Sequence, residues 1–123
     1  GEMARLVKKS ISDVENNRIE ISREYAKENG VIVLLKGYNT VITNGEKTII
    51  NTTGTSKMAS GGMGDCLSGI IGSLVGQSKN LFNSAILGAY IHGKSGDKLG
   101  KTRFSVNSRD IIEAIPSIME DLN

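Results

Sequence analysis

The stretch VIVLLKG, residues 31–37, decides the fold class of this chain. It is a continuous apolar run between Gly30 and Gly37, it begins with β-branched residues, and it is too short for a typical helix. Such a run is typical of a strand buried on both faces, as in a parallel sheet covered by helices. The sequence therefore predicts a strand here and an α/β protein around it.

A β-hairpin is predicted directly after this strand. The segments TVIT (40–43) and KTIIN (47–51) flank the dipeptide Asn44-Gly45. Asn-Gly favours the positive φ values of a type I′ turn, whose twist matches that of paired strands. We therefore expect residues 40–51 to form two antiparallel strands.

Helical patterns account for most of the remaining chain. A short helix is expected at residues 2–9. The S-x-x-E pattern of Ser12 and Glu15 predicts a capping box that opens a second helix, and Gly30 is a natural residue to end it. Further helices are predicted from near Asp65 onward, at about residues 82–94, and after a cap at Ser108.

The helix that follows Asp65 contains three interior glycines. They are Gly69, Gly72 and Gly76, and they interrupt an apolar stripe that begins at Leu67. Each interior glycine costs about 1 kcal/mol of helix stability relative to alanine. We therefore expect these glycines to be compensated by close packing against a strand, another helix or a ligand.

The composition limits the classes of protein that fit. The 123 residues carry a formal net charge of +2 and only 4% aromatic residues, whereas nucleic-acid binding favours a basic stripe with interleaved aromatics. Cys66 is the sole cysteine, so an internal disulfide is impossible and a reducing, cytoplasmic location is expected. The apolar runs are too short to span a membrane. The sequence therefore predicts a protein that binds neither nucleic acid nor membrane.

The run SGGMGD, residues 60–65, carries the candidate chemistry. Glycine N–H groups can approach an anion closely, and a helix that begins near Asp65 adds about half a positive charge at its N-terminus. These features predict a phosphate site, to which Ser60 and Thr55 would donate hydrogen bonds. The run fits neither the P-loop nor the dinucleotide-binding fingerprint. The local pattern is therefore equally compatible with a tight turn in which Asp65 only caps a helix.

The position of Asp65 favours the chemical interpretation. A carboxylate repels phosphate, so helix stability alone explains poorly why an acid stands beside an anion site. The position is reasonable if Asp65 accepts the proton of a substrate hydroxyl while the backbone amides hold a transferred phosphoryl group. The residues therefore indicate phosphoryl transfer.

Several motifs together resemble one known family. The motifs LLKG (34–37), KMASGGMGDCLSG (57–69) and HGKSGD (92–97) come in the order and spacing of ribokinase-like proteins. With GEMARL (1–6), they most resemble the ADP- or ATP-dependent NAD(P)H-hydrate dehydratases, which also form the carbohydrate-kinase-like domain of bifunctional NAD(P)H-hydrate repair enzymes. The resemblance implies a three-layer ribokinase-like fold. Residues 1–123 would be the C-terminal portion of one such domain and would need its N-terminal portion.

The resemblance also implies an activity and a set of site residues. In such enzymes ADP (or ATP), with Mg²⁺, phosphorylates the ring hydroxyl of hydrated NADH or NADPH (NADHX or NADPHX), and phosphate then leaves to restore the cofactor. Carried over by position, Asp65 is the catalytic base, and Asp65 and Glu2 contact the substrate. The anion hole consists of Gly61, Gly62 and Gly64. The nucleotide contacts are Lys36, Gly37, Tyr38, Asn39, Thr40, Thr55, Ser60 and Gly64. No metal site built from side chains is expected. The protein is expected to form a homo-oligomer.

Some positions depart from the family pattern or remain open. Met63 stands where Thr or Ser is usual, which removes a hydroxyl donor but leaves the backbone amide. Thr55 follows Gly54 where Asn is common. Cys66 is expected to be a packed thiol rather than a nucleophile, and His92 is expected to be structural. Lys36 fits a phosphate contact and a solvated strand-end lysine equally well.

Two other functions remain open from the residues. A ribokinase-like kinase of a vitamin precursor or sugar would use the same G-x-G-D element. A non-catalytic nucleotide-binding fragment would bind the nucleotide without turnover.

Overall fold

The computed structural model describes residues 1–123, which form two compact units, Gly1–Asn51 and Thr52–Asn123. Each unit has its own helices and its own packing. None of the helices combines the length and the apolarity that a membrane span requires.

The first unit opens with three helices, α1 (Glu2–Val7), α2 (Ile11–Asn16) and α3 (Arg18–Asn29). The capping box of α2 is formed by Ser10 and Asp13, so the prediction that Ser12 and Glu15 form it was wrong. Ser10 and Asp13 have the same spacing as Ser12 and Glu15, so the two patterns overlap. The earlier pattern forms the capping box because α2 already begins at Ile11. Gly30 ends α3 in the left-handed conformation, with φ of 62°, as predicted.

The sheet of the first unit has three antiparallel strands in the order β1 (Val33–Leu35), β2 (Thr40–Thr43), β3 (Thr48–Asn51). Leu35 pairs with Val41, and Thr43 pairs with Thr48. The expectation of a strand in a parallel sheet, buried on both faces, was wrong for this structure: β1 pairs antiparallel, and of its residues only Val33 is buried. The short connection between β1 and β2 requires this direction, because a parallel neighbour needs a crossover of about a dozen residues or more.

The predicted hairpin is confirmed, but its turn is not of type I′. Gly45 has a φ of 94°, whereas Asn44 does not share the positive φ that a type I′ turn requires. The Asn44 side chain instead accepts hydrogen bonds from the N–H groups of Glu46 and Lys47, at 3.0 and 2.7 Å. The pairing of Thr43 with Thr48 leaves residues 44–47 as the loop, which is too long for the two-residue turn.

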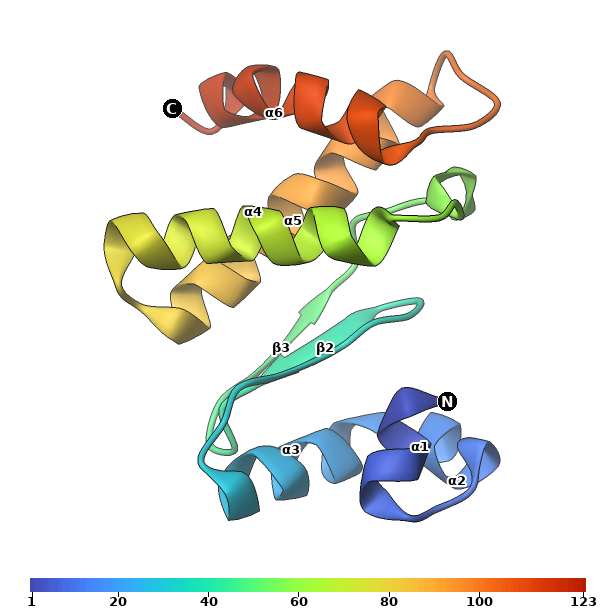
Figure 1. Ribbon diagram of the computed structural model, residues 1–123, viewed down its shortest axis with the longest axis vertical. Helices are drawn as coiled ribbons and strands as arrows, with labels where there is room; N and C mark the ends of the chain where they lie inside the picture. The colour runs from blue at the N-terminus through green and yellow to red at the C-terminus, as the bar shows by residue number, and fades with distance from the viewer. The chain divides into compact units, whose positions relative to one another are not determined.

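The core of the first unit lies between its helices and its sheet. Helix α3 packs against β1 and β2, and Figure 1 shows it running along the sheet. Buried apolar side chains from both layers form one cluster, Met3, Ala4, Val14, Ile21, Ala26 and Val33.

The second unit consists of a short 3-10 helix, η1 (Ser56–Met58), and three long helices, α4 (Met63–Ser78), α5 (Leu81–Gly100) and α6 (Ser108–Asp121). Helix α5 packs against both α4 and α6, as Figure 1 shows. The predicted cap at Ser108 was wrong by one residue. Asn107 is the N-cap, and it forms a capping box with Asp110.

The close glycine packing of the second unit lies in α5 rather than in α4. A Cβ added at Gly69, Gly72 or Gly76 would meet no atom within 4 Å, so the expectation of close packing there is not met in this structure. By contrast, a Cβ at Gly88 of α5 would lie 2.6 Å from Cγ1 of Ile71. The small residue of the helix pair is therefore supplied by α5, and Ile71 of α4 fills the space above it.

Candidate functional site

The predicted site residues divide between the two units. Glu2 and the segment Lys36–Thr40 belong to the first unit, and Thr55, Ser60, Gly61, Gly62, Gly64 and Asp65 belong to the second. Glu2 is the first residue of α1 and is exposed.

The glycine-rich run places Asp65 in the first turn of α4. Gly62 is the N-cap, with φ of 83°, and its carbonyl accepts from the N–H of Cys66 at 3.0 Å. Asp65 is the third residue of the helix and is exposed, so it does not occupy the cap position that the alternative interpretation gave it. No side chain caps this helix. The N–H groups of its first turn are therefore available to a bound anion beside the Asp65 carboxylate.

The segment before these glycines is tied to the C-terminal end of α5. Thr55 is the N-cap of η1, and its hydroxyl accepts from the N–H of Lys57 at 3.3 Å. The Lys57 ammonium group donates to the carbonyl of Gly100 at 2.5 Å, where a positive charge suits the end of a helix. The Thr55 hydroxyl thus already has a structural partner in this structure.

The HGKSGD motif supplies positions that the sequence interpretation did not assign to the site. Gly93 and Gly96 lie so close to Thr53 and Met58 that an added Cβ at either would collide with those residues. Asp97 accepts a hydrogen bond from the N–H of Gly54 at 3.1 Å. Since these positions of α5 are three and four residues apart, they share one helix face. From this spacing the sequence could have predicted that one face of α5 packs against the segment that precedes the glycine-rich run.

His92 is half-buried in the same helix. Burial lowers the pKa of its imidazole, and a backbone hydrogen bond with Met63 acts in the opposite direction. Its Nε2 atom is buried without a hydrogen-bond partner. Because Met63 is the first residue of α4, His92 contacts the start of the candidate anion-binding helix. Its expected structural role stays a prediction.

An open apolar groove of about 640 Å³ runs along α4 from Gly62 to Gln77 and includes Ile112, Ile115 and Met119 of α6. Asp65 is the only charged residue that lines it. Cys66 also lines it, and the Cys66 sulfur lies 3.9 Å from the carbonyl oxygen of Ser108. Burial raises the pKa of this thiol, which disfavours the nucleophilic thiolate form.

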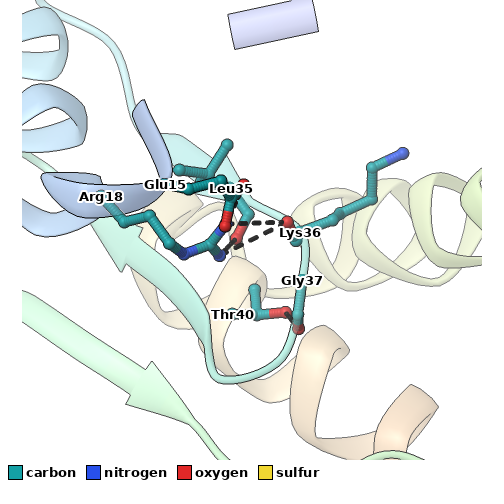
Figure 2. Close-up of polar contacts among 6 residues, drawn as sticks. All are labelled: Glu15, Arg18, Leu35, Lys36, Gly37 and Thr40. Carbon is teal, nitrogen blue, oxygen red and sulfur yellow. Dashed lines mark hydrogen bonds and ion pairs between the residues drawn. The ribbon is translucent and has the colours of Figure 1, made fainter. Parts of the chain in front are cut away.

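In the first unit, the Lys36–Thr40 segment consists of the connection between β1 and β2 and the first residue of β2, and it is called the Lys36–Thr40 loop. Two of its backbone conformations are unusual, with φ of 153° at Gly37 and 59° at Asn39. The Thr40 hydroxyl closes the loop by donating to the carbonyl of Gly37 at 3.2 Å (Figure 2). The Tyr38 side chain is 94% exposed. The loop therefore has a defined backbone and presents Tyr38 to solvent.

Comparison with known proteins places this chain in a family. Residues 1–117 match the model of the NAD(P)H-hydrate dehydratase family. A bifunctional NAD(P)H-hydrate repair enzyme from Moorella thermoacetica is 38% identical over 125 residues, which cover 99% of this chain and 24% of that protein. An ADP-dependent (S)-NAD(P)H-hydrate dehydratase from Cenarchaeum symbiosum is 34% identical over 122 residues, 98% of this chain and 42% of that protein.

Solved structures show the same fold. An ADP/ATP-dependent NAD(P)H-hydrate dehydratase from Bacillus subtilis, crystallised with ATP and Mg²⁺, matches with a TM-score of 0.94 at 22% identity, over 100% of this chain and 46% of that one. A ribokinase-like superfamily protein from Enterococcus faecalis matches with a TM-score of 0.74 at 33% identity, over 82% of this chain and 36% of that one. The fold is thus ribokinase-like, and the chain spans less than half of each of these four proteins. The family match over residues 1–117 shows that the chain belongs to the NAD(P)H-hydrate dehydratase family.

Proposed function

We propose that the natural protein containing this sequence is an ADP-dependent dehydratase of hydrated NADH and NADPH. The observation that carries the proposal is the first turn of α4, where helix N–H groups without a side-chain cap stand beside the exposed Asp65 carboxylate. Family membership supports it, and so do the names of the relatives from Cenarchaeum symbiosum and Nitrosopumilus maritimus, both ADP-dependent (S)-NAD(P)H-hydrate dehydratases.

The proposed residues act at different points of this reaction. Asp65 accepts the proton of the ring hydroxyl, whose oxygen attacks the terminal phosphoryl group of ADP (or ATP). The backbone amides of Gly61, Gly62 and Gly64 balance the negative charge of that group, and the shortened nucleotide leaves. The C–O bond to the phosphate then breaks, inorganic phosphate departs, and the neighbouring ring carbon loses a proton, so that the double bond of the nicotinamide ring forms again. Glu2 is proposed as a substrate contact.

The nucleotide contacts are proposed in the same way. Lys36–Thr40 and Ser60 would contact the nucleotide, and Thr55 would have to exchange its present hydrogen bond for such a contact. No group of three or more His, Cys, Asp or Glu side chains suits a metal ion here. Nucleotide phosphates with bound water are the usual ligands of Mg²⁺ in such sites, so the ion would arrive with the nucleotide. A homo-oligomeric state and a cytoplasmic location stay predictions.

The test supplies the intact natural protein with ADP, Mg²⁺ and NADHX and follows the absorbance of NADH. The Asp65→Asn variant should lower turnover by about 10²–10⁴-fold, the usual contribution of a general base, and should leave nucleotide affinity nearly unchanged. The matched control is Asp121→Asn, an exposed carboxylate on α6 whose ion pair with Lys98 contributes little. Near-normal turnover of Asp65→Asn would refute the assigned role.

Parallel assays of the same protein, with other hydroxyl substrates and with the nucleotide alone, separate the other two functions. Accumulation of a stable phosphorylated product from a hydroxymethyl pyrimidine, a thiazole or a sugar would indicate a kinase. Nucleotide binding without any turnover, unchanged by Asp65→Asn, would indicate a non-catalytic module.

A further inference from the structure

The side chain of Arg18 contacts the point at which the Lys36–Thr40 loop leaves β1. Arg18 is the first residue of α3. Its Nη2 atom donates to the carbonyl of Leu35 at 3.0 Å and to that of Lys36 at 3.4 Å, and its Nη1 atom donates to the Lys36 carbonyl at 3.4 Å. Figure 2 shows the guanidinium group bridging these two carbonyls at the point where β1 ends and the loop begins.

The same guanidinium group determines the space around Gly37. A Cβ at Gly37 would lie 2.9 Å from both Nη1 and Nη2 of Arg18, so the glycine and the guanidinium group are in close contact. The φ of 153° at Gly37 is in any case unfavourable for residues with a side chain. Arg18 and Gly37 therefore fit each other, and together they set the path of the loop toward Tyr38 and Asn39.

The N–H donors of the Arg18 guanidinium group are already used by the protein, which argues against direct binding of a phosphate by Arg18. Both terminal nitrogens of Arg18 already have acceptors, since Nη1 also lies 3.5 Å from Oε1 of Glu15. The Arg18 side chain is only 16% exposed, whereas Lys36 is exposed. In Figure 2 the Lys36 side chain points away from the guanidinium group. The Lys36 ammonium group can therefore bind an anion, whereas the Arg18 guanidinium group is hydrogen-bonded to backbone carbonyls.

We propose that Arg18 is a positioning residue for nucleotide binding, which acts by holding the Lys36–Thr40 loop through the Leu35 and Lys36 carbonyls. This inference rests on the proposed function in one respect, the assignment of the loop to the nucleotide. Without the guanidinium fork, the loop samples more conformations, and nucleotide binding must order it. The effect belongs to binding rather than to the chemical step.

The experiment compares Arg18→Ala and Arg18→Lys with the intact natural protein and with Arg23→Ala, an exposed arginine on the same helix. The measurements are the Kd of ADP by calorimetry, KM and kcat with NADHX, and hydrogen exchange of residues 36–40. For Arg18→Ala we expect a rise of about 10-fold in the Kd and KM of ADP, which corresponds to one lost hydrogen bond to a charged group. We expect kcat to change less than about 3-fold and exchange in the loop to be faster.

The conservative variant tests the bridging geometry. Lysine keeps the charge but has no planar fork, so Arg18→Lys should recover only part of the affinity. Full recovery would show that charge alone suffices and would overturn the proposal. Unchanged ADP affinity in Arg18→Ala, or a loss of kcat without a change in affinity, would also overturn it.

If the unaltered protein binds ADP but does not convert NADHX, the proposed function fails while Arg18 is still tested through the Kd. If it binds no ADP, both fail.

Discussion

The contact between Gly93 and Thr53 predicts that Gly93→Ala disturbs the segment leading to the glycine-rich run. A Cβ at position 93 would lie 2.7 Å from the carbonyl carbon of Thr53 and still closer to its hydroxyl oxygen. Because the carbonyl carbon is backbone, the whole Thr53–Gly54 segment must shift. Overpacking of this kind costs about 1–3 kcal/mol, and alanine returns up to about 1 kcal/mol of helix propensity. Because the collision is with backbone, the upper part of the overpacking range, about 2–3 kcal/mol, applies. Subtracting about 1 kcal/mol of helix propensity leaves an expected net loss of about 1–2 kcal/mol in the free energy of unfolding.

Urea unfolding of the intact natural protein measures this loss, and kinetics of the proposed dehydratase reaction measure its consequence. We expect kcat/KM to fall by about 10–10²-fold, because a small displacement of positioned groups is enough to misalign a reaction. The matched control is Lys94→Ala, the next residue along α5, whose side chain is exposed. Its stability and activity should stay near the original values. A Gly93→Ala variant as stable and as active as this control would refute the reasoning that Gly93 is required by contact with Thr53.

Two further predictions concern stability alone. Burial lowers the pKa of His92 in the folded state, so its contribution to stability is complete above the ordinary histidine pKa of about 6.5 and is lost as the pH falls toward the lower folded value. Urea unfolding between pH 7 and 5 should show the free energy of unfolding falling by at most about 1.4 kcal/mol per pH unit. The His92→Gln variant should lack this component, and an identical pH dependence in both proteins would contradict the assignment. Asn107→Ala should destabilise the protein by about 1 kcal/mol through loss of the N-cap of α6, whereas Ser108→Ala should cost less. Thermal unfolding of the two variants measures both losses, and a larger loss for Ser108→Ala would show that Ser108 is the cap.

The sequence predicted those parts of the fold that local chemistry specifies. Gly30 ends α3 as expected, because a left-handed residue is needed there and glycine adopts it without strain. The hairpin was found from Asn44-Gly45, although its turn type was not. The caps were displaced by one or two residues, since Ser10 competes with Ser12 and Asn107 with Ser108. Neighbouring residues of similar capping strength leave the choice to the packing of the helix.

The parts that failed depend on partners distant in the chain. The direction of β1 is determined by its pairing with β2, which an apolar run alone does not reveal. The glycines of α5 were missed as supports because their contacts, Thr53 and Met58, belong to a different segment. For the candidate site, the sequence predicted a helix that begins near Asp65, and α4 begins two residues earlier, at Met63. The role of Arg18 was missed because its carbonyl partners, Leu35 and Lys36, lie 17 and 18 residues further along the chain.

The cap of α4 explains why a glycine precedes Asp65. Serine, asparagine or aspartate at an N-cap accepts a hydrogen bond from an N–H group of the first turn, and this stabilises the helix. Gly62 has no side chain to do so, and its φ of 83° is one that glycine adopts readily. Replacing a good cap with glycine costs only a few tenths of a kcal/mol. For that small loss, α4 keeps its first-turn N–H groups available to an anion, and the one acid in that turn is left exposed beside them. A glycine cap at this helix end therefore costs little stability and suits the binding role that we propose for it.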